Sequence, residues 1–322
     1  RAVAGTGSGL QPARGWFLFA IGSLVLAGLL SLMLVIGRLP FLGWLFTDPL
    51  FFKRALVVHV DLAIVVWFQA GALAFLGLAL GPRLPRGVTT AAFTLAGLGV
   101  AGLLVGALMP GALPVLSNYV PVIDHPVFFA GLVGWFAGSG LFFAYALVTP
   151  ARADAQALPP AVVVALRAAA AANVLALITF AGAWRTTPVA APLAYYELLF
   201  WGGGHVLQAG NVALMLALWL HLLQRWTGRA VLSPATVTAL MTALIAPQVV
   251  MPWLAFAGTT GTAYFTMATH LMRWTLFPVV LVVLGMRWVS GISLEAAERR
   301  TALVGQMRFA VTLQDLRTVL VL

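Results

Sequence analysis

The chain is built around one stretch, Lys53-Arg-Ala-Leu-Val-Val-His59-Val-Asp61-Leu-Ala-Ile-Val-Val-Trp67-Phe-Gln69. Its histidine and aspartate stand two residues apart in a run that is otherwise apolar and long enough to enter a bilayer. An ionisable side chain at the centre of a membrane costs about 2.5–3.5 kcal/mol on insertion scales. Two such groups in one membrane helix therefore indicate a binding or relay function, and His59 is the first candidate functional residue.

Composition places the whole chain in a membrane. Of 322 residues, 62% are hydrophobic and only 8% are charged, and the apolar residues recur in runs of membrane-spanning length rather than in the alternating pattern of a β-barrel. There is no cysteine, which excludes disulfides and thiolate ligands. The net charge of +10 comes from arginines outside the apolar runs, so it indicates membrane topology and no nucleic-acid partner is expected.

The expected fold class is all-α, a polytopic integral membrane bundle of about eight transmembrane helices. The expected spans are 15–37, 54–81, 88–108, 126–148, 160–183, 194–224, 231–257 and 263–288. Pro126, Pro160 and Pro234 suit the first turn of a helix, and Pro247 and Pro252 predict a kink in the seventh span. Residues 1–288 form the expected bundle, and residues 289–322 are interpreted as a cytoplasmic amphipathic tail or a truncated further helix.

The basic residues predict the orientation. Twelve of them fall at the termini or in even-numbered connections, and four fall in odd-numbered connections. The four are Arg38, Lys53, Arg54 and Arg185. The positive-inside rule therefore predicts a cytoplasmic N-terminus.

In that orientation, four of the five histidines share the outer leaflet. At 1.5 Å per residue, His59, His205 and His270 lie roughly 8–15 Å below the outer surface, and His125 opens the fourth span. Neutral imidazole is a usual ligand for haem iron and copper, so we expect His59, His205 and His270 to be metal or haem ligands. The alternative is that each histidine is hydrogen-bonded inside the bundle. His221, at the other end of its span, is expected to be inert.

Three further features have two interpretations each. His125 precedes Pro126 at a helix mouth, where it would cap the helix or contact a haem propionate. Arg273, one turn after His270, would meet Asp61, Glu197 or a propionate. The run Gly202-Gly203-Gly204 lies at membrane depth and would let either a flat macrocycle or a neighbouring helix approach the backbone.

Four short motifs carry a family resemblance. They are Phe52-Lys-Arg-Ala-Leu-Val-Val-His59-Val-Asp-Leu, Asn118-Tyr-Val-Pro-Val-Ile-Asp-His125-Pro126-Val-Phe-Phe, Leu199-Phe200-Trp201-Gly-Gly-Gly-His205 and Thr262-Ala-Tyr264-Phe265-Thr266-Met-Ala-Thr269. In this order they resemble the second helix, a later loop, the sixth helix and the eighth helix of the haem-copper oxidase catalytic subunit, the superfamily of cytochrome c oxidase and nitric-oxide reductase. The resemblance implies that His59 ligates a low-spin haem and that His205 stands at the non-haem metal position.

The departures from that family imply an incomplete oxygen-reducing centre. Val250 and Met251 stand about where the family carries adjacent histidines, and the tyrosine expected shortly after His205 is absent. The family's tenth helix, which ligates both haems, has no counterpart before Leu322. We therefore expect b-type haem and no copper site.

The sequence thus predicts a multi-pass subunit of a respiratory complex in the bacterial inner membrane. It would bind haem b, transfer electrons, and contact lipid and other subunits, with a cytochrome c or a quinone as redox partner. One alternative is a non-redox membrane anchor of such an assembly, with a quinone or lipid groove. Another is a small-molecule or ion carrier that uses Asp61, Glu197 and Arg273.

Overall fold

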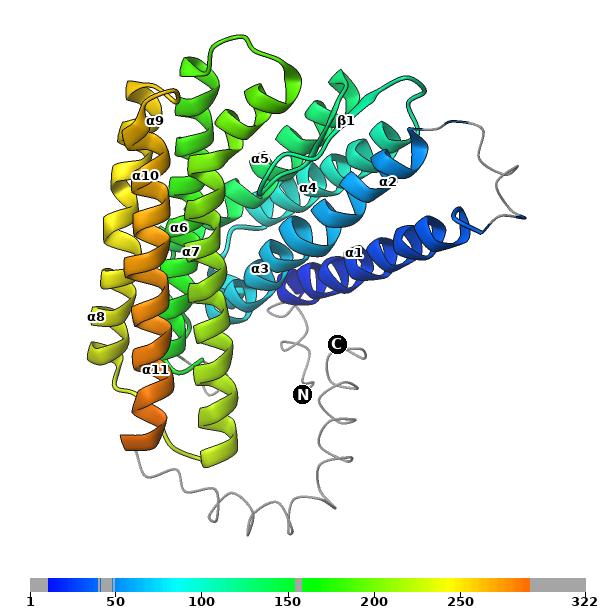
Figure 1. Ribbon diagram of the computed structural model, residues 1–322. Coiled ribbons are helices and arrows are strands. Elements are labelled where there is room, and N and C mark those ends of the chain that lie inside the picture. The colour runs from blue at the N-terminus through cyan, green and yellow to red at the C-terminus, as the bar shows by residue number, and fades with distance from the viewer. Residues whose placement is uncertain (1–10, 40, 42–47, 49, 154–157, 290–322) are drawn as a thin grey trace, which may run out of the picture.

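A computed structural model describes residues 11–39, 41, 48, 50–153 and 158–289 (Figure 1). Within these residues, eight continuous helical segments are long and apolar enough to cross a membrane, and some of them consist of consecutive helices. The all-helical, multi-span expectation is therefore confirmed, and the proposed tail at 289–322 lies almost wholly outside the described residues. The helices are α1 (Gln11–Ile36), α2 (Phe51–Val60), α3 (Trp67–Leu80), α4 (Arg86–Ala107), α5 (Pro126–Val148), α6 (Pro160–Thr186), α7 (Pro192–Thr227), α8 (Pro234–Ile245), α9 (Val250–Ala257), α10 (Thr262–Leu271) and α11 (Phe277–Val289).

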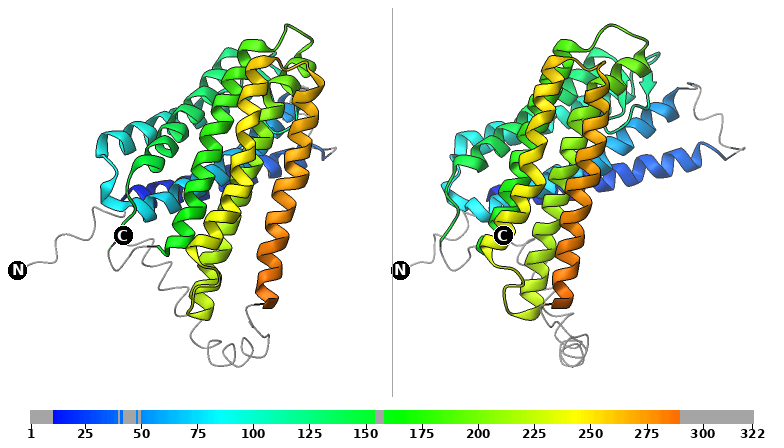
Figure 2. Two further views of the ribbon diagram at one scale, coloured as in Figure 1. Left: turned by 90° about the vertical axis from the view of Figure 1, so that its left-hand side faces the viewer. Right: turned by 60° about the vertical axis from the view of Figure 1, so that its left-hand side comes forward.

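The helices form two sets. Figures 1 and 2 show α6 to α11 running side by side, with α1 to α4 inclined to them. Helices α6 and α7 join the sets, because both pack against α3 and against α9, and α7 also packs against α10. Side chains carried by α7 can therefore reach both halves of the bundle.

Helix α1 exposes an apolar surface. Val25, Leu29, Leu32 and Val35 are each more than half exposed, and they lie along a helix whose sequence is almost entirely apolar. Water would solvate such a surface poorly, whereas lipid tails cover it without cost. The exposed apolar helices are thus suited to contact with a bilayer.

Proline sets helix boundaries as predicted. Pro126, Pro160 and Pro234 each occupy the first turn of a helix, where the missing amide has no partner to lose. Pro247 lies in the 3₁₀ turn Ala246–Val249 that interrupts the seventh span between α8 and α9. The predicted break in this span is therefore present.

Helices α4 and α5 pack through small residues at backbone contact. A Cβ atom built on Gly99 would lie 2.2 Å from the backbone nitrogen of Trp135, and one built on Gly102 would lie 2.7 Å from the Cα of Gly131. A Cβ on Gly138 would lie 2.5 Å from the Ala92 carbonyl oxygen. Only glycine permits this approach, so Gly99, Gly102 and Gly138 serve the packing of the two helices.

The connection between α4 and α5 contains an element that the sequence did not predict. Strand β1 (Leu113–Val115) pairs antiparallel with β2 (Val122–Asp124), and Pro114 lies opposite Ile123. The tip of this hairpin, residues 116–121, returns toward α7. It supplies part of the candidate site described below.

Arg54 joins α2 to the end of α4 and to the segment that leads into the hairpin. Its side chain is 1% exposed, and it donates from Nε to the Ala107 carbonyl at 2.9 Å and from Nη1 to the Ala112 carbonyl at 3.3 Å. It also forms an ion pair with Asp48, which holds the pKa of that carboxyl below its ordinary value. Arg54, which the sequence places in an odd-numbered connection, is a buried structural residue.

Candidate functional site

His59 is held in one tautomer by the neighbouring helix. Its Nδ1–H donates to the Ala27 carbonyl of α1 at 2.8 Å, and the half-buried ring lies near the end of α2. With the proton on Nδ1, Nε2 keeps its lone pair. Metal-ligating histidines usually have this arrangement, in which the second ring nitrogen donates to a carbonyl.

Asp61 begins a π-helical segment, Asp61–Val66, that joins α2 to α3. The residue is 1% exposed, and neither carboxyl oxygen has a hydrogen-bond partner in the described part of the chain. An unpaired polar group in an apolar interior costs about 1–3 kcal/mol even when it is uncharged. Asp61 is therefore a buried polar group that a proton, a water molecule or a bound species must satisfy. Single π-helical turns occur often at functional sites.

His205 uses both of its ring nitrogens inside the protein. Nδ1–H donates to the Trp201 carbonyl one turn earlier at 2.8 Å. Nε2 then accepts from the Tyr119 hydroxyl, which lies 2.9 Å away at the tip of the hairpin. This arrangement is the hydrogen-bonded alternative, and the role of His205 as a metal or haem ligand stays a prediction.

Aromatic side chains occupy the space beside the glycine run. Cβ atoms built on Gly202, Gly203 and Gly204 would lie 2.7 Å or less from the side chains of Tyr264, Phe180 and Tyr119 respectively. The run therefore serves approach by neighbouring elements rather than by a macrocycle. The Tyr264 hydroxyl also accepts from the Gly202 amide at 2.9 Å and donates to the Leu198 carbonyl at 3.1 Å. The tyrosine thus contacts two backbone groups one helical turn apart on α7.

The hairpin tip is fastened to α7 at further points. Asn118 donates two hydrogen bonds to the carboxylate of Glu197. Its backbone nitrogen donates to Oε1 at 3.0 Å, and its side-chain Nδ2 donates to Oε2 at 2.9 Å. Tyr196 donates to Asp124 Oδ1 at 2.8 Å. Tyr119 has a φ of +68°, a conformation that L residues seldom adopt. Burial and the nearby Glu197 charge raise the pKa of Tyr119 to about 12.

His270 and Arg273 lie on the outside of the bundle. Both side chains are exposed, and α10 packs against α7 and α9 while α2 packs chiefly against α1 and α4. The structure therefore does not bring His270 to His59. Arg273 does not meet Glu197, which is bonded to Asn118, or Asp61, which has no hydrogen-bond partner.

The other two histidines, His125 and His221, contact protein groups. His125 is the N-cap of α5, where its Nδ1 accepts from the Val127 amide at 3.2 Å, so the capping interpretation is confirmed. The His221 ring packs edge-on against Phe75 with 6.2 Å between centroids. Among the described residues, no group of three or more His, Cys, Asp or Glu side chains gathers in one place.

A cavity of about 540 Å³ lies between the second span, α7 and the hairpin tip. Its lining residues are Val60, Ile64, Val65, Gln69, Ser117, Asn118, Tyr119, Pro121, Trp201, Gly204, Leu207, Gln208 and Asn211. None of them carries a formal charge at neutral pH. Trp201 Nε1 and Gln208 Oε1 are buried and have no hydrogen-bond partner within the described structure.

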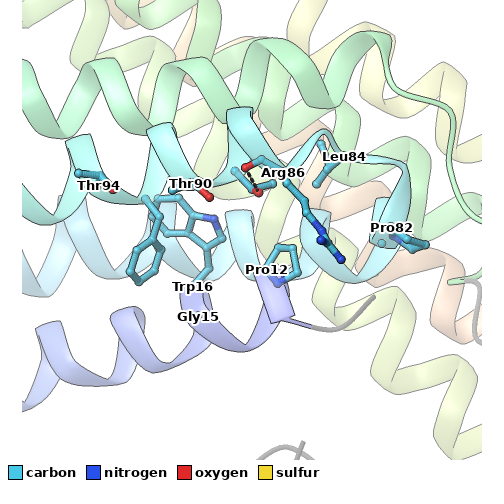
Figure 3. A pocket seen from close by; sticks show the side chains of 11 residues that line it. Pro12, Gly15, Trp16, Pro82, Leu84, Arg86, Thr90 and Thr94 are labelled. Atoms are coloured by element: carbon cyan, nitrogen blue, oxygen red, sulfur yellow. Dashed lines mark hydrogen bonds between the residues drawn. The ribbon is translucent and has the colours of Figure 1, made fainter. Parts of the chain in front are cut away.

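A second cavity, of about 460 Å³, lies where α1 meets the start of α4 (Figure 3). Figure 3 shows Arg86, Thr90 and Trp16 on its walls, with the Thr89 hydroxyl donating to the Arg86 carbonyl at 2.9 Å. It is separate from the histidines and from the first cavity.

Sequence reasoning missed Tyr119, Trp201 and Gln208 as site residues. Tyr119 lies 86 positions from His205 along the chain, and its left-handed backbone is not visible in the residue type. Gln208 could have been identified from the sequence, because a side-chain amide inside an apolar span is uncommon.

Two curated proteins are similar to this chain, and both are described as uncharacterized proteins. One, from Aquifex aeolicus (strain VF5), is 33% identical over 211 residues, which cover 65% of this chain and 53% of that protein. The other, RP382 of Rickettsia prowazekii (strain Madrid E), is 28% identical over 245 residues, which cover 67% of this chain and 48% of that protein. The chain spans about half the length of these relatives. No protein-family profile and no solved structure matches it.

Proposed function

We propose that this chain is a membrane subunit of an electron-transfer assembly and holds a b-type haem through His59. The observation that supports this most directly is the hydrogen bond from His59 Nδ1 to the Ala27 carbonyl. It fixes the tautomer and the ring orientation and leaves Nε2 as the ligating nitrogen. A haem bound there supplies one-electron redox chemistry.

Among the described residues, one histidine has a ring nitrogen and a position suited to an axial haem ligand. His205 has no ring nitrogen free, because one donates to Trp201 and the other accepts from Tyr119. His270 is exposed on a helix that does not pack on α2. The proposal therefore assigns His59 alone. No copper site is proposed. Val250 and Met251 stand about where the haem-copper oxidase family, which the chain resembles, has histidines.

The proposed setting is the bacterial inner membrane, with the N-terminus in the cytoplasm. The relatives are bacterial proteins of about twice the length of the matched region, and the exposed apolar helices suit lipid or further membrane helices. Other subunits of a respiratory complex, with a cytochrome c or a quinone as redox partner, complete the proposal.

Replacement of His59 tests this proposal. The full chain purified from a haem-replete host should show a Soret band, and His59→Ala should remove it or change its spin state, because the axial imidazole is lost. His270→Ala is the matched control and should leave the spectrum unchanged, since its side chain is exposed. A spectrum that is unaltered in His59→Ala would show that His59 is not the ligand.

A non-redox membrane anchor is the second candidate. It is favoured by the glycine run, where the side chains of Tyr264, Phe180 and Tyr119 fill the space that a macrocycle would need. A purified chain without any Soret band, from cells that load haem into other proteins, would support this candidate instead.

A further inference from the structure

We propose that the cavity between α1 and the start of α4 binds the headgroup of an anionic phospholipid, with its phosphate at Arg86 and its ester groups beside Thr90 and Thr94. General contact with a bilayer needs no such site, because lipid tails cover any apolar helix. The inference rests neither on haem at His59 nor on the orientation of the chain in the membrane.

The cavity lies at one end of two apolar spans. Pro12 begins the first span and Arg86 begins the third, and both residues line the cavity. It therefore lies at the level where the headgroups of a bilayer meet its hydrocarbon. Helix α1 packs mainly against α3 and only lightly against α4, which leaves this space between α1 and α4.

The surface end of the cavity is positively charged. In Figure 3 the Arg86 side chain extends from α4 toward Pro12, and none of the described residues that line the cavity is Asp or Glu. The first turn of α4 adds to this charge, because Pro85 provides no side-chain cap and free amides make this end of a helix positive. Such a site favours a phosphate, and it offers no carboxylate to the ammonium group of a zwitterionic lipid.

Hydrogen-bond donors continue from Arg86 into the membrane. Thr90 and Thr94 follow at intervals of four residues, so the three side chains lie on one face of α4 and span about 12 Å along its axis. Figure 3 shows one hydrogen bond among the lining residues, from the Thr89 hydroxyl to the Arg86 carbonyl, and none from Thr90 or Thr94. The ester carbonyls of a glycerophospholipid lie below its phosphate and accept hydrogen bonds, so these two hydroxyls suit them.

Trp16 supplies a buried donor to the same cavity. Its side chain is 1% exposed and lines the cavity, and its ring packs edge-on against Phe93 with 5.3 Å between centroids. The indole N–H of Trp201 is sealed inside the protein, whereas that of Trp16 is open to the cavity and has no hydrogen-bond partner in the described part of the chain. A ligand oxygen at this point would satisfy a donor that the protein leaves unpaired.

Apolar surface leads away from the cavity along both helices. Leu98, four residues after Thr94, is 66% exposed, and Leu18, three residues after Gly15, is 44% exposed. The tails of a lipid can lie on this surface while its headgroup occupies the cavity. A free phosphate would use the charged end alone, so the site fits a lipid better than a free anion.

Native mass spectrometry of the full chain in an uncharged detergent, titrated with phosphatidylglycerol or phosphatidylcholine, tests the inference. We expect phosphatidylglycerol to bind about tenfold more tightly. Arg86→Gln should weaken its binding about tenfold, because a charge-assisted hydrogen bond is lost, and Thr94→Val about threefold to fivefold, because a neutral one is lost. Arg185→Gln and Thr266→Val make the same changes at exposed positions outside the cavity lining. These matched controls should bind like the unmodified chain.

A chemical measurement makes the test independent of the folding of these variants. Because the chain has no native cysteine, Thr90→Cys gives one thiol in the cavity, and Thr266→Cys gives one exposed thiol on α10. In phosphatidylcholine nanodiscs, added phosphatidylglycerol should slow the reaction of N-ethylmaleimide with Thr90→Cys and leave that with Thr266→Cys unchanged. Equal binding of the two lipids, unchanged affinity in Arg86→Gln, or an unprotected Thr90→Cys would each overturn the inference. Protection by inorganic phosphate alone would also overturn it and would indicate a site for a free anion.

Discussion

At the scale of single residues, the hydrogen bond between Tyr119 and His205 is the contact that most directly joins the hairpin tip to the bundle. It links a loop residue with a φ of +68° to a histidine that is 3% exposed. Together with the two hydrogen bonds from Asn118 to Glu197, it holds the tip against α7. Removing it should loosen the tip without disturbing the helices.

Tyr119→Phe is therefore expected to lower the free energy of unfolding by about 1 kcal/mol, the usual contribution of one hydrogen bond. It should also change the pH dependence. Burial raises the pKa of Tyr119 from 10.0 to about 12, so between these values the unfolded chain releases a proton that the folded chain keeps. Stability is thus complete below pH 10 and falls as the pH rises toward 12.

Thermal unfolding of both proteins in the same detergent, measured from pH 8 to pH 11, checks this expectation. The unmodified chain should lose more stability in the alkaline range than Tyr119→Phe does. Parallel curves for the two proteins would show that Tyr119 does not titrate in this way.

At the scale of elements, the glycine contact between α4 and α5 makes a sharp prediction. Gly102→Ala places a Cβ 2.7 Å from the backbone of Gly131, and backbone cannot move aside as a flexible side chain can. We expect a loss of about 1–3 kcal/mol, the usual cost of overpacking.

Gly97→Ala is the control for this substitution. It lies on the same helix with nothing within 4 Å of the added Cβ, and alanine favours a helix over glycine by about 0.5–1 kcal/mol. It should therefore be neutral or stabilising when thermal unfolding is compared in one detergent. Equal stability of the two variants would mean that α4 and α5 are not in backbone contact.

The helices were predictable because each span is a long apolar run, and most of the spans begin at or near a proline. The hairpin was not, because strands of three residues leave no periodic pattern. The position of a residue along a helix follows from the fixed rise per residue, so the sequence was enough to predict similar depths for His59 and His270. The direction of each side chain depends on packing between helices, and packing leaves His270 on the outer surface.

At the scale of the whole molecule, the distribution of arginines predicts how the bundle is oriented. The rule of positive cytoplasmic loops places Thr260 outside and Arg83 inside. Both positions are exposed, and the chain has no cysteine of its own. Thr260→Cys should therefore react with a membrane-impermeant maleimide added to intact cells, and Arg83→Cys should react only after the cells are opened. The reverse pattern would invert the topology and place the histidines in the inner leaflet.

The Tyr264 hydroxyl between Leu198 and Gly202 has a consequence for how this protein changes over evolutionary time. The Tyr264 hydroxyl accepts from the Gly202 amide and donates to the Leu198 carbonyl, and its ring takes the space that a side chain at position 202 would need. Loss of the tyrosine makes room for a larger residue. A larger residue at 202 that arises first meets the ring and is removed by selection. Positions 202 and 264, although 62 residues apart, are therefore expected to vary together among relatives, with glycine at 202 wherever the tyrosine is kept.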